Sequence, residues 1–219
     1  MKRILMVMTR YPEEGRCKKR LMEYLGRKGA TKLHRQLVGK TMETCTRFSS
    51  NSSVALVVFY SGGNRRLMEA WLGKDVPFVP QTGTDLGLRM FNALRWAFEQ
   101  GFKKAVIVGT DCPMLTDIHL TESFRMLEEK DVVIGPALDG GYYLIGMKGA
   151  WPELFMDVKW GCNTVFEITM ERVKGLGLKG AFLDRLPDVD RPEDLGFLQG
   201  RFLKQKYMDW VHGSGKGGI

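Results

Sequence analysis

Short apolar runs alternate with longer amphipathic stretches along most of the chain. The runs at 4–8, 54–60, 105–109 and 131–136 are rich in valine and isoleucine, which predicts strands buried on both faces. The stretches at 29–48, 64–72, 85–100 and 117–129 repeat apolar residues at helical spacing; Leu86, Met90, Leu94 and Phe98 form one such stripe. This alternation predicts an α/β fold with a mostly parallel sheet covered by helices on both faces.

The pattern changes after residue 136. We expect a strand over 140–148, opened by two glycines, then a helix over 163–174 and a strand over 180–184. The stretch from Arg191 predicts a final helix with Pro192 in its first turn. The last residues, 213–219, have the composition of a flexible tail. No internal repeat or change of composition divides the sequence, so we expect one domain over 1–219.

Composition places the chain among folded globular proteins. It is 44% hydrophobic and 26% charged, which is not typical of disorder. The four cysteines form no C-x-x-C pair, which indicates reduced thiols rather than disulfides or a zinc site. The apolar core near the first residue is too short for a signal peptide, and no run approaches the about 20 apolar residues of a membrane span. We expect a cytoplasmic protein, and the sequence leaves a homodimer open.

The net charge of +8 suits nucleic acid, a membrane surface or phosphorylated substrates. From Thr9 to Arg20, directly after the first strand, the chain carries five cations and two carboxylates. Such a run is usually a solvated face. Alternatively, Gly15 would let main-chain N–H groups face a phosphate. The loop has neither the P-loop nor the dinucleotide-fold glycine spacing.

Carboxylates follow the later strands, where ligands of parallel sheets bind. Asp111 comes directly after the strand at 105–109, and Asp188 and Asp190 precede Pro192. Magnesium commonly takes one or two carboxylates together with phosphates and waters. Asp111 could equally cap a loop, and Asp188 or Asp190 could cap the final helix. Both interpretations stay open at this point. Cys112 is predicted to be a buried filler, and the scattered histidines to be surface or packing residues.

Five motifs stand in order at the expected strand ends: GRCKKRL (15–21), QTGTDLGLRM (81–90), GTDCPML (109–115), DGGYYLIG (139–146) and DVDRPEDL (188–195). Together they resemble a bacterial family of unknown function within the nucleotide-diphosphosugar transferase superfamily, over roughly residues 3–200. That superfamily has the glycosyltransferase-A fold, a three-layer Rossmann-like sheet. The sequence is also similar to nucleotidyltransferases such as the 2-phospholactate and molybdopterin guanylyltransferases.

The resemblance implies roles for the matching residues. Those expected to bind the nucleotide are Thr9, Gly15, Arg16, Lys18, Arg20, Gly83, Asp85 and Arg89. Those expected to hold a Mg²⁺ or Mn²⁺ ion are Asp111 and Asp190, and those expected to face the substrate are Asp139, Gly140 and Gly141. The catalytic residues would be Lys18, Arg20 and Asp111.

The sequence departs from the family at four positions. Lys19 replaces a threonine, and Leu138 replaces a residue that is often acidic. Gly161 and Cys162 stand where small hydroxyl residues are usual after Trp160. The changes at 138, 161 and 162 concern the acceptor side of the expected site more than its nucleotide side.

Two reactions suit such a site, because both rest on positioning and charge stabilisation. The cation-rich loop favours nucleotidyl transfer from an NTP onto a phosphorylated small molecule. So does the sequence Thr110-Asp111-Cys112, where many glycosyltransferases have Asp-x-Asp. The alternatives are a glycosyltransferase that uses an NDP-sugar donor and a non-catalytic nucleotide- or nucleic-acid-binding protein. No nucleic-acid-binding motif is recognisable, so we expect a nucleotide and a small acceptor as partners and no nucleic acid.

Overall fold

The computed structural model describes residues 2–198 of the chain. Within them, seven strands form one sheet in the order β3-β2-β1-β4-β6-β5-β7. Their bounds are Arg3–Arg10 (β1), Val54–Ser61 (β2), Phe78–Pro80 (β3), Lys104–Val108 (β4), Val132–Pro136 (β5), Tyr142–Met147 (β6) and Gly180–Phe182 (β7). Only β6 runs antiparallel to its neighbours, β4 and β5. The predicted α/β fold with a mostly parallel sheet is confirmed.

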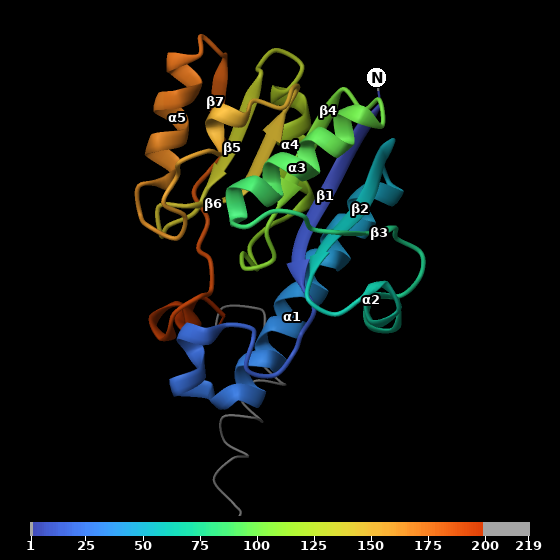
Figure 1. Cartoon of the computed structure of the whole chain (residues 1–219), viewed down its shortest axis with the longest axis vertical. Helices are drawn as coiled ribbons and strands as arrows, with labels where there is room; N and C mark the ends of the chain where they lie inside the picture. The colour runs from blue at the N-terminus through green and yellow to red at the C-terminus, as the bar shows by residue number, and fades with distance from the viewer. Residues whose placement is uncertain (1, 199–219) are drawn as a thin grey trace, which may run out of the picture.

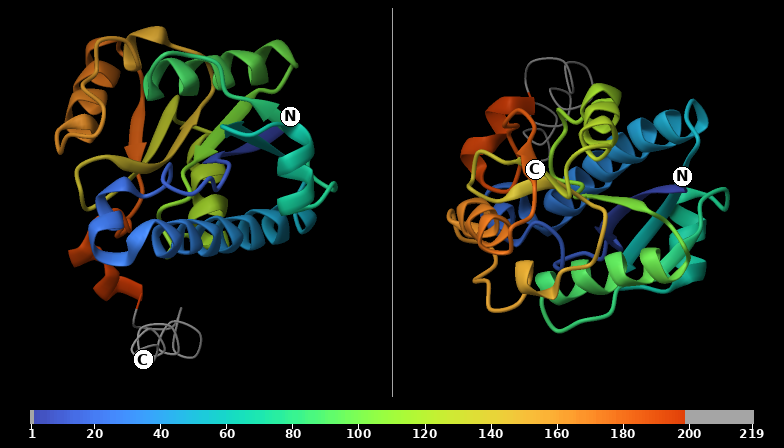
Figure 2. Two further views of the ribbon diagram at one scale, coloured as in Figure 1. Left: turned by 60° about the horizontal axis from the view of Figure 1, so that its bottom comes forward. Right: turned by 90° about the horizontal axis from the view of Figure 1, so that it is seen from above.

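Helices cover both faces of the sheet (Figures 1 and 2). The α-helices are Met22–Ser50 (α1), Arg65–Leu72 (α2), Leu86–Glu99 (α3), Asp117–Met126 (α4) and Val165–Gly175 (α5). The 3-10 helices are Lys19–Leu21 (η1), Pro152–Leu154 (η2) and Pro192–Leu198 (η3). Helices α1, α2 and α4 pack on one face and α3 and α5 on the other, which gives three layers.

The strands are buried on both faces, as their apolar runs predict. In β1, Leu5 and Val7 belong to the core under α1 and α4. Ile4, Met6 and Met8 belong to the core under α3 and α5. Successive side chains of a strand point to opposite faces, so each core receives every second residue. The polar residues that follow each strand are therefore left at the carboxyl edge.

A third, smaller core joins the first half of α1 to the last described residues of the chain. Leu21 and Leu25, around the start of α1, pack with Val189 and Leu195, around the start of η3. Figure 1 shows the two segments side by side below the sheet. Gly26 interrupts α1 with a φ of 69°, so the first turn can leave the line of the long helix. This core brings the loop after β1 to the segment that follows β7.

Some elements differ from the expectation. The final helix is a 3-10 helix in its described part, and its remainder and the tail at 213–219 lie outside the described residues. Strand β3 was not predicted, because three residues are too few to show a period. Thr116 is the N-cap of α4, and its N–H donates to Nδ1 of His119 at 3.1 Å. Among residues 2–198, no helix is both long and apolar enough to cross a membrane.

Candidate functional site

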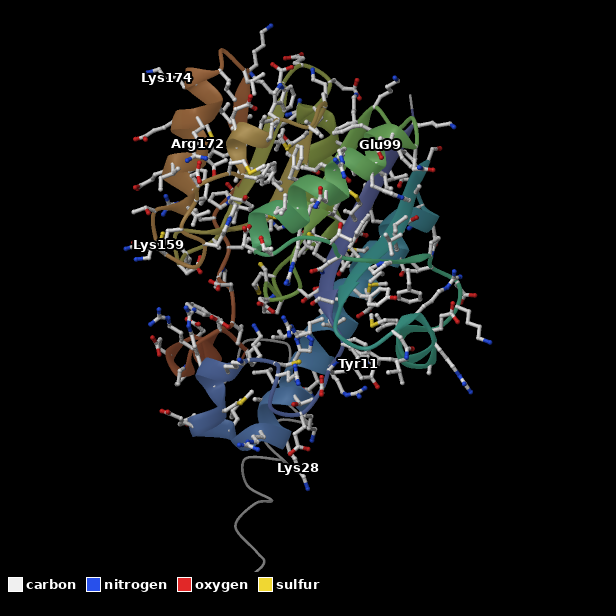
Figure 3. The ribbon with its side chains drawn as sticks, viewed as in Figure 1. Tyr11, Lys28, Glu99, Lys159, Arg172 and Lys174 are labelled. Atoms are coloured by element: carbon white, nitrogen blue, oxygen red, sulfur yellow. The ribbon has the colours of Figure 1, made fainter. Side chains whose placement is uncertain are left out.

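A cleft of about 460 Å³ opens at the carboxyl edge of the parallel strands. In Figure 3 Tyr11, directly after β1, lies at this end of the molecule, and Glu99, at the end of α3, lies at the other. Nine predicted site residues line the cleft: Thr9, Arg16, Lys18, Arg20, Arg89, Asp111, Asp139, Gly141 and Asp190. The rule that ligands bind beyond the strand ends therefore locates the cavity correctly.

Lys18 joins the first loop to both predicted metal ligands. Its side chain is only 3% exposed, and its Nζ lies 2.7 Å from Asp111 Oδ1 and 3.7 Å from Asp190 Oδ1. The same Nζ donates to the carbonyl of Val189 at 2.6 Å. Lys18 has a φ of 50°, in the left-handed region that residues other than glycine rarely adopt. Such a conformation persists where the surroundings fix it, and here the three contacts of the ammonium do so.

Arg20 completes this group of charges from the more exposed side. Its Nη1 donates to Asp190 Oδ2 at 2.6 Å, and its side chain is half exposed. The segment that carries Asp190 is held in place by Val189, whose N–H donates to the carbonyl of Asp111 at 2.8 Å. The side chain of Val189 is fully buried in the third core. These anchors place the two aspartates on either side of Lys18.

Neither Asp188 nor Asp190 caps the last helix, contrary to one of the two interpretations of the sequence. The carboxylate of Asp194, inside η3, instead binds the backbone just before the helix. It accepts from the N–H groups of Asp190 at 2.9 Å and Arg191 at 2.7 Å. The side chain of Asp194 thus reaches back to the start of η3 and provides an acceptor for these two N–H groups. Asp188 and Asp190 are left to face the cleft.

Three further arginines line the cleft around the charged group: Arg10, Arg16 and Arg89. Arg16 is 65% exposed and pairs with Glu13 at 3.2 Å. The Nε of Arg89 donates to the carbonyl of Gly83 at 3.0 Å, and this hydrogen bond orients the guanidinium group. Arg16 and Arg20, unlike Lys18, are exposed enough to meet an anionic ligand.

The glycine turn between β5 and β6 is shaped by a close contact. A Cβ on Gly140 would lie 2.0 Å from the carbonyl oxygen of Asn163, and its φ is 87°. The carboxylate of Asp139 accepts the N–H of Gly141 at 2.8 Å, which tightens the turn. Asp139 and Gly141 line the cleft. Gly140 is required by the packing of the turn against the segment around residue 163.

An aromatic wall closes one side of the cleft. Trp160 stacks on Phe155, with ring centroids 6.5 Å apart, and meets the edge of Tyr142 at 6.2 Å. Gly87, near the start of α3, makes room for the indole, because a Cβ there would lie 2.5 Å from it. Both Trp160 and Tyr142 line the cleft.

Comparison with known proteins assigns the family. A family model described as "Uncharacterized protein conserved in bacteria (DUF2064)" matches residues 44–162, more than half of the chain. The chain belongs to this family. The resemblance inferred from the five motifs is thereby confirmed.

Relatives of this DUF2064 protein are transferases by description. The 2-phospho-L-lactate guanylyltransferase of Methanocaldococcus jannaschii is 27% identical over 115 residues, which are 50% of this chain and 50% of that protein. The match thus spans about half the length of the curated relative. A crystal structure from Desulfovibrio desulfuricans G20, provisionally described as a nucleotide-diphospho-sugar transferase, is 30% identical and has a TM-score of 0.86. The aligned region covers 98% of this chain and 96% of that one.

More distant structures share the fold alone. The 4-diphosphocytidyl-2C-methyl-D-erythritol synthase of Anaerococcus prevotii DSM 20548 has a TM-score of 0.60 at 12% identity, covering 93% of this chain and 97% of its own. The manganese complex of Rv0371C from Mycobacterium tuberculosis H37Rv has a TM-score of 0.52 at 16% identity, covering 93% and 100%. The DUF2064 chain thus has the fold of the nucleotide-diphosphosugar transferase superfamily.

Burial changes the acid–base properties of several cleft residues. It raises the pKa of Asp188 to about 6, with a further rise from the negative charge of Asp139. It lowers the pKa of His34, which lies on α1 and lines the cleft. The Nε2 of His34 lies 2.9 Å from the carbonyl of Arg10, so this nitrogen carries the hydrogen of the neutral ring. Burial also raises the pKa of Cys112 to about 12, as expected of an inert filler.

Four predicted residues lie outside the lining of the cleft: Gly15, Gly83, Asp85 and Gly140. Asp85 is the N-cap of α3, and its Oδ1 accepts the N–H of Leu88 at 2.9 Å. At Gly83, with a φ of 138°, a Cβ would lie 2.8 Å from the backbone nitrogen of Arg89. Both residues shape the start of α3, so the motif around residues 83–89 has a structural reason independent of any ligand.

The sequence analysis gave no role to Gln81, His34 and Trp160, which line the cleft. The Nε2 of Gln81 donates to the carbonyls of Thr9 at 3.0 Å and Phe59 at 2.9 Å, and thus ties the ends of β1 and β2 together. Gln81 directly follows β3, so recognition of that short strand would have identified it by the strand-end rule. His34 and Trp160 had no comparable local signal.

The two carboxylates fit a divalent ion that takes its other ligands from elsewhere. Asp111 is 47% exposed and Asp190 30% exposed; both adjoin the ammonium of Lys18, and Asp190 also pairs with Arg20. Among the residues that the structure describes, no three acidic, histidine or cysteine side chains form a metal-binding group. Magnesium is commonly held by one or two carboxylates with phosphates and waters, and this pair has that composition.

Proposed function

We propose that this DUF2064 protein is a metal-dependent nucleotidyltransferase that uses an NTP and a phosphorylated small molecule. The main support is the group formed by Lys18, Arg20, Asp111 and Asp190 at the carboxyl edge, inside the cleft. Arg20, with Arg16 nearby, provides cations for a polyphosphate, and the two aspartates provide carboxylates for a divalent ion. The guanylyltransferase relative supports the same class of reaction.

In this reaction a phosphate oxygen of the acceptor attacks the α-phosphorus of the NTP. The bond from that phosphorus to the bridging oxygen of the β-phosphate breaks, and pyrophosphate leaves with the electron pair. The arginines would stabilise the charge on the phosphates, and Arg16 and Arg20 have the exposure that this requires. The protein would contribute positioning and charge, as in other phosphoryl-type transfers.

Asp111 and Asp190 would hold the Mg²⁺ or Mn²⁺ ion, and the nucleotide would supply further oxygen ligands. A bound divalent ion supplies positive charge that offsets the phosphates. The manganese complex of Rv0371C, which has the same fold, is in keeping with this proposal. Asp188, which adjoins the charge of Asp139 in the cleft, is proposed to lie on the acceptor side with the turn at 139–141.

Glycosyl transfer is the second candidate, favoured by the description of the Desulfovibrio desulfuricans relative. The two reactions differ in the leaving group. Nucleotidyl transfer releases pyrophosphate from an NTP, whereas glycosyl transfer releases a nucleoside diphosphate from a sugar nucleotide. Incubation with α-labelled NTPs, NDP-sugars and a set of phosphorylated small molecules would separate them. Release of the diphosphate without pyrophosphate would overturn the first proposal.

Binding is tested by thermal unfolding with Mg²⁺ or Mn²⁺ and each NTP or sugar nucleotide. We expect one nucleotide class to raise the melting temperature only with the metal, and Asp111→Asn to lose this rise. Asp75→Asn is the matched control, because Asp75 is exposed and does not line the cleft. A flat response of the wild-type protein to every nucleotide would contradict the proposed site.

A further inference from the structure

The ammonium of Lys18 is buried against oxygens of the protein, whereas a lysine that only binds phosphate would extend into the cleft. Lys18 Nζ donates to Val189 O at 2.6 Å, pairs with Asp111 Oδ1 at 2.7 Å and lies 3.7 Å from Asp190 Oδ1, within ion-pair distance but beyond a hydrogen bond. Its side chain is 3% exposed, whereas Arg20 is half exposed and Arg16 more so. The ammonium is thus turned toward the two carboxylates and a carbonyl, and it is almost closed off from solvent. Arg16 pairs with Glu13 through Nε and Arg20 with Asp190 through Nη1, and each guanidinium has five N–H donors, so others remain for a phosphate.

The position of the ammonium has an electrostatic consequence. It lies between the two carboxylates proposed to hold the divalent ion, at 2.7 and 3.7 Å. Two carboxylates that face a common point repel each other, and the ammonium near both of them offsets that repulsion, while Arg20 pairs with Asp190 from the more exposed side at 2.6 Å. The same cation repels a metal ion that approaches the pair, with an energy that is large at such short distances.

We propose that Lys18 is a positioning residue that acts as the resident counter-ion of Asp111 and Asp190, and so limits how tightly this pair binds a divalent cation without nucleotide. This inference rests on the proposed metal site but not on which group is transferred. Lys18 holds the two carboxylates in place through its contacts, and its charge lowers their affinity for free metal. The metal is then bound best together with a nucleotide, whose phosphates bring the negative charge that offsets Lys18.

The test is the affinity of the nucleotide-free protein for Mn²⁺, measured by titration with electron paramagnetic resonance or calorimetry. Lys18→Met removes the charge, and we expect its dissociation constant for Mn²⁺ to be about tenfold lower than that of the wild type. Lys19→Met is the matched control, because Lys19 is the exposed neighbour in the same loop and loses the same charge. It should change the constant by less than about twofold, the effect of a screened surface charge.

Lys18→Gln is the second variant in case Lys18→Met does not fold, because its neutral amide can still donate to a carbonyl or a carboxylate. Tighter Mn²⁺ binding by either variant supports the inference, and loss of structure alone cannot produce it. Unchanged or weaker binding by folded Lys18 variants would overturn it, as would equal tightening in Lys19→Met. Failure of the proposed reaction would appear differently, as absent pyrophosphate release with the Mn²⁺ affinities still ordered as described.

Discussion

Burial decides which single residues of the first loop can meet a ligand. Lys18 and Arg20 are two positions apart, yet one is 3% and the other 50% exposed. Lys18 points inward between Asp111 and Val189, and these contacts hold its backbone in the left-handed conformation. The resemblance to the family implied one nucleotide-binding role for Arg16, Lys18 and Arg20. A lysine is rarely buried unless it is paired, and Lys18 is paired. The roles differ because the partners of Lys18 lie far away in the chain.

His34 gives a prediction about pH. Burial lowers its pKa below 6.5, so the unfolded chain binds a proton more readily than the folded protein just below that pH. The free energy of unfolding should therefore fall as the pH drops below about 6.5, and this contribution should be constant above it. His34→Gln should reduce the pH dependence in urea unfolding measured from pH 5 to 8.

His119→Gln is the control, because the pKa of His119 is also lowered by burial but it lies in the cap of α4. We expect His34→Gln to flatten the dependence of the unfolding free energy on pH more than His119→Gln does. An unchanged pH profile in His34→Gln would show that the buried ring does not contribute as stated.

At the scale of elements, the glycine turn before β6 depends on the loop before α5. The contact that Gly140 makes with Asn163 leaves no space for a side chain, and the N–H of Phe166 donates to the carbonyl of Gly140 at 2.9 Å. The turn and the start of α5 therefore hold each other. Asp139 and Gly141 reach the cleft as a result.

Gly140→Ala is expected to lower the free energy of unfolding by at least about 3 kcal/mol, since overpacking adds to backbone strain. Gly177→Ala is the matched control, with a φ of 69° and no atom within 4 Å of the added Cβ. It should cost only the strain, about 1 kcal/mol. Urea unfolding of both variants measures the difference, and equal losses would contradict the contact.

Asp85 illustrates how an element's cap can resemble a ligand-binding residue. Asp85→Ala should lower the free energy of unfolding by about 1 kcal/mol, because α3 loses its N-cap. Asp85→Asn should restore most of it, since asparagine caps equally well. If the role is capping alone, Asp85→Asn also keeps the wild-type response to nucleotide in thermal unfolding. A loss of that response with stability intact would assign Asp85 to ligand binding.

These elements also show what a sequence can predict here. The apolar runs located β1, β2, β4 and β5, and with them the strand ends that carry Lys18 and Asp111. The antiparallel direction of β6 has no signature in its apolar pattern, because alternation is the same in both directions. The third core was not predicted either, since Leu21 and Val189 are distant in the sequence and no local period links them.

On the scale of the whole molecule, the site exists only where distant segments meet. The loop that follows β1 and the segment that follows β7 share the third core and the contacts of Lys18 and Arg20. The sheet between them is held by its own two cores. Local opening of the third core would therefore separate Asp190 from Asp111 while the sheet stays folded.

Hydrogen–deuterium exchange tests this coupling. A metal–nucleotide complex that bridges Asp111 and Asp190 should slow exchange at 15–25 and at 188–198 together, because both segments must open for either to lose the ligand. Leu195→Ala, which opens a cavity in the third core, should speed exchange in both segments and leave β1 and β4 protected. Slowing at 15–25 alone would mean that the nucleotide binds without Asp190. The pair of carboxylates would then not act as one site, and the segment after β7 would only support the fold of the loop.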